Sequence, residues 1–230
     1  MADYKLSAEG TTVKVTMTPS VTMTQISSPC GLASRSVESL LQQIAALPEE
    51  GSGSAVEALV TATVTASAHW IESAINELFD KCVLVAESNI APLDREKVIE
   101  IGKLWSDPGE DGERLRRSTT TDKWKYFVKH FTGETTDKTD KRPHAARLLT
   151  KLRNVIAHGK PWRLPTEESH RELEACLRKE FKMNKGTSNR PFYPYQVLSR
   201  GCAEWSAKTA RAYIRYELDR LGLTKPMLGV

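Results

Sequence analysis

Apolar side chains recur at helical spacing along most of the chain after its first thirty residues. In residues 54–87 they return every three or four positions, which places them on one face of a long helix. The early stretch LVTATVT is rich in β-branched residues, which have a lower helix propensity. That face comprises Leu59, Val64, Ile71, Ile75, Leu78, Phe79 and Cys82. Residues 34–47, which end before Pro48, predict a shorter helix ahead of it. A final helix of roughly 25 residues carries a similar stripe, namely Leu198, Cys202, Trp205, Thr209, Ala212 and Tyr216.

Further helices are predicted at residues 93–105, 121–131, 143–158 and 166–182. Gly133 follows the second of these spans, and Pro143 suits the first turn of the third. The stretch SDPGEDGE, residues 106–113, has the composition of a loop. We therefore expect an all-α fold, a bundle of about six helices formed by residues 31–230.

The first thirty residues follow a different pattern. Val13, Val15 and Met17 alternate with polar residues, and Val21 and Met23 repeat the alternation after the turn-forming TPS. A period of two around a turn predicts a short β-hairpin or an extended arm over residues 1–30. Because two strands alone are marginally stable, such an arm needs the helical body or another chain to pack against.

Composition narrows the class of protein. The 230 residues are 40% hydrophobic and 27% charged, and no apolar run approaches the ~18 residues of a membrane helix. The N-terminus lacks the positive and apolar segments of a secretory signal, so we expect a cytoplasmic protein with no membrane contact. The four cysteines are far apart and form no CxxC pair, so no metal site and no cofactor is predicted.

Positive charge is concentrated in one part of the chain. Residues 138–163 hold eight Lys or Arg and one Asp, which gives this segment a net charge of +7. Because the whole chain carries only +4, the remaining residues together carry −3. Such a local positive field favours a polyanionic partner such as nucleic acid. The alternative interpretation is that these residues form the solvated faces of helices.

The sequence LLTKLRNVIAHGKPW, residues 148–162, lies within this basic region. A helical wheel at ~100° per residue groups Leu148, Leu149, Leu152, Val155 and Ile156 as a buried stripe. Arg153, Asn154 and His158 fall on the opposite face, where the interior does not need them. A histidine in a last helical turn is also a common partner of the helix dipole, so spacing alone does not assign a function.

The segment LRNVIAHG, residues 152–159, resembles the signature of the HEPN superfamily. In that signature an arginine and a polar residue, often asparagine, precede a histidine near the end of a core helix, as Arg153, Asn154 and His158 do here. The leucine-rich run before the motif and Gly159 after it are also similar. The resemblance is confined to this motif and the surrounding helices, and it is nearest to the larger bacterial HEPN ribonuclease domains.

The resemblance implies a HEPN-like all-α fold that dimerises and a metal-independent endoribonuclease of bacterial antiviral defence or toxin–antitoxin type. Arg153 and His158 would form the catalytic pair, with Asn154 as an orienting residue. These residue types suit the chemistry, because histidine exchanges protons near neutral pH and arginine offers a fork of donors to phosphate oxygens. One toxin subgroup carries a tyrosine two residues after the histidine; Lys160 stands there, so modification at that position is not implied.

Further expectations concern binding partners. We expect Lys151, Arg147, Lys160 and His144 to contact RNA, although solvated residues at these positions would look the same. We also expect a homodimer through the Arg153/His158 face of the helix, with two arginines and two histidines around one cleft, and an antitoxin or sensor protein as a further partner. Two other readings stay open: a catalytically inactive module that binds RNA, nucleotide or protein, and a structural helical subunit of a larger complex.

Overall fold

The computed structural model describes residues 28–47, 54–84, 90, 92–135, 139–158, 168–185, 187 and 189–223. These residues form helices and no strands, which confirms the all-α class. The expected hairpin falls mainly on residues 1–27, outside the described part, and residues 29 and 30 of the expected arm already belong to a helix. The helices are α1 (Pro29–Ala46), α2 (Ser54–Leu84), α3 (Arg95–Ser106), α4 (Glu110–Arg117), α5 (Thr120–Thr132), α6 (Lys141–His158), α7 (Glu168–Glu180), the π-helical η1 (Phe192–Gln196) and α8 (Arg200–Arg220).

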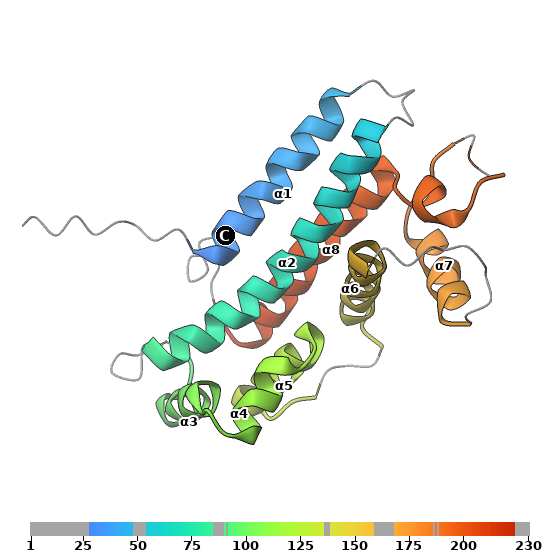
Figure 1. The fold of residues 1–230 in the computed structure, drawn as a ribbon. Helices are drawn as coiled ribbons and strands as arrows, with labels where there is room; N and C mark the ends of the chain where they lie inside the picture. Colours follow the sequence, from blue (N-terminus) through green and yellow to red (C-terminus); the bar gives the residue numbers. More distant parts are fainter. Residues whose placement is uncertain are drawn as a thin grey trace, which may run out of the picture.

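Helix α2 is the axis of the bundle. It packs along α1 and α8, and these three long helices lie side by side (Figure 1). Helices α3, α5 and α6 also contact α2, while α4 packs on α3 and α7 packs on α6. None of the described helices is long and apolar enough to cross a membrane.

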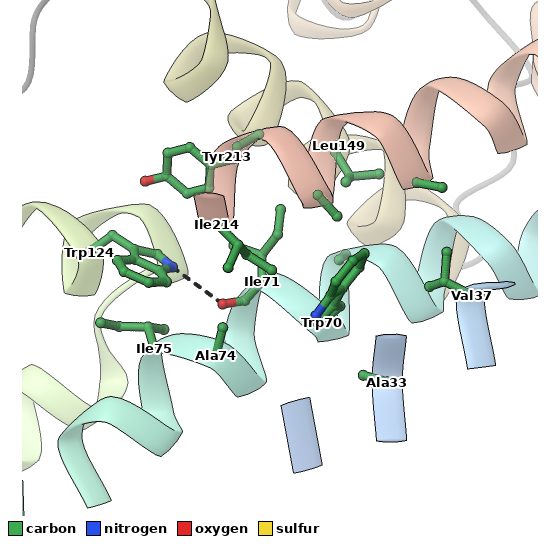
Figure 2. Close-up of a cluster of buried hydrophobic side chains, with 14 of the residues drawn as sticks. Ala33, Val37, Trp70, Ile71, Ala74, Ile75, Trp124, Leu149, Tyr213 and Ile214 are labelled. Atoms are coloured by element: carbon green, nitrogen blue, oxygen red, sulfur yellow. Dashed lines mark hydrogen bonds between the residues drawn. The ribbon is translucent and has the colours of Figure 1, made fainter. Parts of the chain in front are cut away.

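The core is centred on aromatic and aliphatic side chains of α2. Trp70, Ile71 and Phe79 are each at most 1% exposed, and α1 contributes Ala33 and Val37 from the other side (Figure 2). Trp124 of α5 donates its indole N–H to the Ile71 carbonyl oxygen at 3.3 Å, and its ring meets Tyr213 of α8 edge-on. This bond satisfies the polar atom of a large buried side chain, as burial requires.

The β-branched start of α2 is helical, as predicted. The Thr63 and Thr65 hydroxyls donate to the carbonyl oxygens of Leu59 and Thr61, 2.7 Å and 2.9 Å away. Bonds of this kind satisfy threonine hydroxyls inside a helix, and the helix itself is stabilised mainly by burial of Val60 and its neighbours. Tertiary packing here outweighs the weak helix propensity of the local sequence.

The loop predicted for residues 106–113 was wrong in its second half, because α4 begins at Glu110. Acids occupy the first turn of α4 and arginines its last, an order that complements the helix dipole. Gly112 lets this short helix approach the preceding turn: a Cβ there would collide with the Asp107 carbonyl oxygen and lie 2.7 Å from that of Leu104. The glycine that suggested a loop is required for helix packing instead.

Gly102 likewise allows the backbones of α3 and α2 to approach each other closely. A Cβ at Gly102 would lie 2.5 Å from the Cys82 carbonyl oxygen and 2.9 Å from its carbon, both backbone atoms that cannot rotate away. We expect Gly102→Ala to lower the free energy of unfolding by about 1–3 kcal/mol, the usual cost of overpacking, as measured by urea denaturation. Lys103→Ala, an exposed change on the same helix, is the matched control and should stay close to wild type. Equal stability of the two variants would contradict the tight α2–α3 contact.

Candidate functional site

Helix α6 carries the candidate site and is held by its apolar side. Leu148, Leu149 and Leu152 are buried, as the helical wheel predicts. Val155 and Ile156, expected in the same buried stripe, are only half-buried, because they lie near the end of the helix where fewer elements cover it. The helix packs mainly on α8 and α2, which fixes its rotation about its own axis and hence which side chains face outward.

Five polar side chains of α6 form an exposed row along its outer face. They recur at steps of three and four residues, so helical geometry gathers them within an arc of about 80°. All five are exposed, and we call this row the α6 stripe: His144, Arg147, Lys151, Asn154 and His158. The stripe therefore contains three of the residues expected to contact RNA, the expected catalytic His158 and the expected orienting residue Asn154. Lys160 lies outside the described residues.

Arg153 differs from the expectation, because it does not share the outward face with Asn154 and His158. Its side chain is 30% exposed and pairs with Glu72 of α2 at 3.6 Å. On the helix, Arg153 lies about 140° around the axis from His158 and ~7.5 Å along it. The guanidinium thus stands at the boundary between α6 and α2, on the flank of the stripe. At 3.6 Å the pair is longer than a hydrogen bond, so it leaves guanidinium donors for a further anion.

Glu72 belongs to a polar row on α2 that the hydrophobic pattern did not reveal. Glu72, Asn76 and Asp80 are four residues apart and therefore share one face of the helix. Asn76 accepts a hydrogen bond from Lys123 of α5 at 3.1 Å, and Asp80 accepts one from the Trp105 indole of α3 at 2.7 Å. Each member of the row thus meets a different helix. The four-residue spacing of these three polar residues was the available signal.

Lys123 is a buried cation beside this row. It is 5% exposed, and its ammonium group lies 5.3 Å from the centre of the Trp105 ring. Burial lowers the pKa of Lys123, while the negative charges of Glu72 and Asp80 act in the opposite direction. Glu72 therefore interacts electrostatically with Lys123 as well as with its ion-pair partner Arg153.

Cysteine chemistry is disfavoured at three of the four thiols. Cys30, Cys82 and Cys202 are buried, and burial raises the pKa of each thiol to about 12. At physiological pH these groups are neutral and are poor nucleophiles. Among the residues that the structure describes, no group of three or more His, Cys, Asp and Glu side chains is arranged to hold a metal ion.

Comparison of the chain with protein-family models, with curated proteins and with solved structures finds no match.

The Glu72–Arg153 pair is not a major source of stability. Its side chains are 36% and 30% exposed, and partly exposed ion pairs contribute about 0.2–1 kcal/mol. We expect Glu72→Gln to lower the free energy of unfolding by less than about 1 kcal/mol. Leu149→Ala, which empties a fully buried position on α6, should cost about 2–5 kcal/mol in the same urea titration. A larger loss for Glu72→Gln than for Leu149→Ala would make the pair a determinant of the fold.

Proposed function

We propose that the protein is a metal-independent endoribonuclease of the HEPN type that acts as a homodimer. One observation carries this proposal: α6 presents an exposed row of cationic, amide and imidazole groups that ends at His158, while Arg153 stands at its flank. These groups are what internal cleavage of RNA requires, namely a cation for the phosphate and an imidazole for proton transfer. The motif resemblance supports the same assignment.

The proposed reaction proceeds through the 2′-hydroxyl of the substrate. A base removes the proton of that hydroxyl, the oxygen attacks the adjacent phosphorus, and the bond to the 5′-oxygen breaks. The products are a 2′,3′-cyclic phosphate and a 5′-hydroxyl, which receives its proton from an acid. His158 performs one of these proton transfers, because an imidazole changes charge near neutral pH. Arg153 donates to the phosphorane oxygens as their negative charge develops.

Glu72 and Asn154 act as positioning residues in this proposal. Glu72 pairs with one nitrogen of the Arg153 guanidinium at 3.6 Å, which limits the rotation of this side chain and leaves its other donors for a phosphate. Asn154 lies one turn before His158 on the α6 stripe, where its amide reaches either the imidazole or the substrate. Neither residue takes up or releases a proton in the reaction.

A dimer is proposed because one copy of α6 supplies a single motif histidine. Acid and base act on opposite sides of the scissile phosphate, so two proton-transfer groups are needed at one centre, and a second copy of the chain supplies a second His158 for this. Two copies of the α6 stripe packed around a two-fold axis place His158 of each copy near the Arg153 of the other. The exposed side chain of Ala157 leaves space for this approach. An antitoxin or sensor protein that covers the stripe would compete with both RNA and the second copy.

The decisive test is cleavage of a mixed RNA pool in the presence of EDTA. We expect the wild-type protein to cut RNA, and His158→Ala and Arg153→Ala to lose about 10²-fold or more in rate, the usual contribution of a general acid or base. Glu72→Gln should lose rate while Glu72→Asp retains part of it, since both keep the fold but only the latter keeps the charge. His69→Ala removes an exposed histidine outside the α6 stripe and is the matched control.

The product ends provide a second criterion. A 2′,3′-cyclic phosphate or 2′-phosphate end, detected by mass spectrometry, is expected from attack of the 2′-hydroxyl. RNA binding without any cleavage by a folded wild-type dimer would favour the inactive binding module instead. Full activity of His158→Ala would refute the proposed site.

Binding of RNA along the α6 stripe has its own signature. Arg147 and Lys151 are exposed cations, and each phosphate contact that a variant removes lowers the slope of log affinity against log salt by about 1. We expect Arg147→Ala and Lys151→Ala to weaken binding of a labelled single-stranded RNA to His158→Ala protein and to reduce this slope. Lys103→Ala on α3 should leave both quantities unchanged. An unchanged slope in all three variants would remove the stripe from the RNA interface.

A further inference from the structure

A cavity of about 580 Å³ lies between the first turn of α6, the segment after α7 and the first three turns of α8. Figure 1 shows α6 and α7 on the side of α2 and α8 that is away from α1. We call it the α6–α8 pocket. Its lining combines aromatic and small side chains with two acids and four cations, namely Lys141, Arg142, Lys182 and Lys208.

Three of the cations have no ion-pair partner among the residues that the structure describes: Lys141, Lys182 and Lys208. Arg142 is already engaged, because it pairs with Asp140 and stacks on the Tyr216 ring. Glu180 accepts the Trp205 indole N–H at 3.1 Å, which directs this acid toward the protein. The pocket therefore offers more positive than negative charge to a ligand.

The start of α6 carries Lys141 and Arg142 in its first turn, with Asp140 directly before them. Asp140 accepts the Arg142 backbone N–H at 2.8 Å and also pairs with the Arg142 guanidinium, so it compensates Arg142 and the positive end of the helix dipole. The α8 helix begins without an acid in its first turn and contributes Gly201 to the pocket wall. Lys141 is therefore the cation of the α6 start that is left to an anion in the pocket.

The pocket and the α6 stripe are on different sides of α6. Ala145, in the pocket wall, lies about 120° around the helix axis from Lys151 of the stripe. A molecule in the pocket therefore does not occupy the site proposed for RNA cleavage. This separation favours a small ligand over the RNA substrate.

We propose that the α6–α8 pocket binds a small, multiply charged phosphate ester that has a flat apolar ring. The phosphates of the ligand lie among Lys141, Lys182 and Lys208, and its ring lies against Phe181. Phe181 is half-buried and packs on Trp205, with 5.2 Å between the two ring centres. The volume falls in the range of about 300–1,000 Å³ that small-ligand sites occupy. Ammonium groups bind phosphate as point charges, and the aromatic floor gives a ring a surface to stack on. This inference does not depend on cleavage of RNA.

Isothermal titration calorimetry with ATP, inorganic triphosphate and adenosine tests the proposal on the full chain. ATP supplies both parts of the ligand, and the other two probes supply one part each. We expect ATP to bind more tightly than either. Lys182→Glu and Lys208→Glu should weaken ATP binding about tenfold or more, a change of about 1.4 kcal/mol, while Lys103→Glu on α3 should not. Lys208→Gln is the milder variant if a charge reversal disturbs folding, which circular dichroism reports.

The proposal would be overturned if the folded wild-type protein did not bind ATP at concentrations up to about 1 mM, because a Kd of that size already corresponds to weak binding. Equal affinity for ATP and triphosphate would also overturn it, because the ring would then have no contact. Unchanged ATP affinity in the Lys182 and Lys208 variants would move the ligand elsewhere. His158→Ala should bind ATP as the wild type does, so the pocket and the proposed nuclease site fail or succeed independently.

Discussion

Helix α2 packs against α1, α3, α5, α6 and α8, so the position of a side chain around α2 decides which helix it meets. Trp70, Ile71 and Phe79 fill the interior between these helices, and burial of such side chains supplies most of the driving force for folding. Polar side chains of α2 meet the neighbouring helices where its surface is only partly covered. The row Glu72, Asn76 and Asp80 has one partner each on α6, α5 and α3.

This constraint explains where the candidate site stands. Glu72 reaches α6 at Arg153, near the C-terminal end of that helix, and so brings an acid and a guanidinium together at the surface. Lys123 of α5, which donates to Asn76 of the same row, is a second cation that interacts electrostatically with Glu72. An arginine held in this way loses less side-chain entropy when it binds a phosphate than a fully free one. The same packing that completes the core therefore orients the residue proposed to bind the scissile phosphate.

Helix α6 contributes to three different parts of the structure. Its leucines face α8 and α2, its outer face carries the α6 stripe, and its first turn lines the α6–α8 pocket. Eighteen residues suffice for this, because a helix repeats every 3.6 residues and exposes distinct faces along its length. Among the described cations of residues 138–163, Arg147 and Lys151 belong to the α6 stripe and Lys141 and Arg142 line the α6–α8 pocket, so one group is proposed to bind RNA and the other a small phosphate ester.

The hydrophobic pattern predicted the helical class, the apolar face of α2, the leucine stripe of α6 and the outward position of Asn154 and His158, because periodicity reports which side of a helix is apolar. It placed the buried face of α8 less well, since Tyr213, Ile214 and Leu218 are buried whereas the expected Ala212 and Tyr216 are only half-buried. It failed at α4, where glycine allows close packing instead of a turn. Only the tertiary structure decided the partner of Arg153 and the roles of Glu72 and Lys123. A wheel assigns an angle to each residue, but it contains no information on which helix lies at that angle, and contacts between residues distant in sequence follow from the packing of the whole chain.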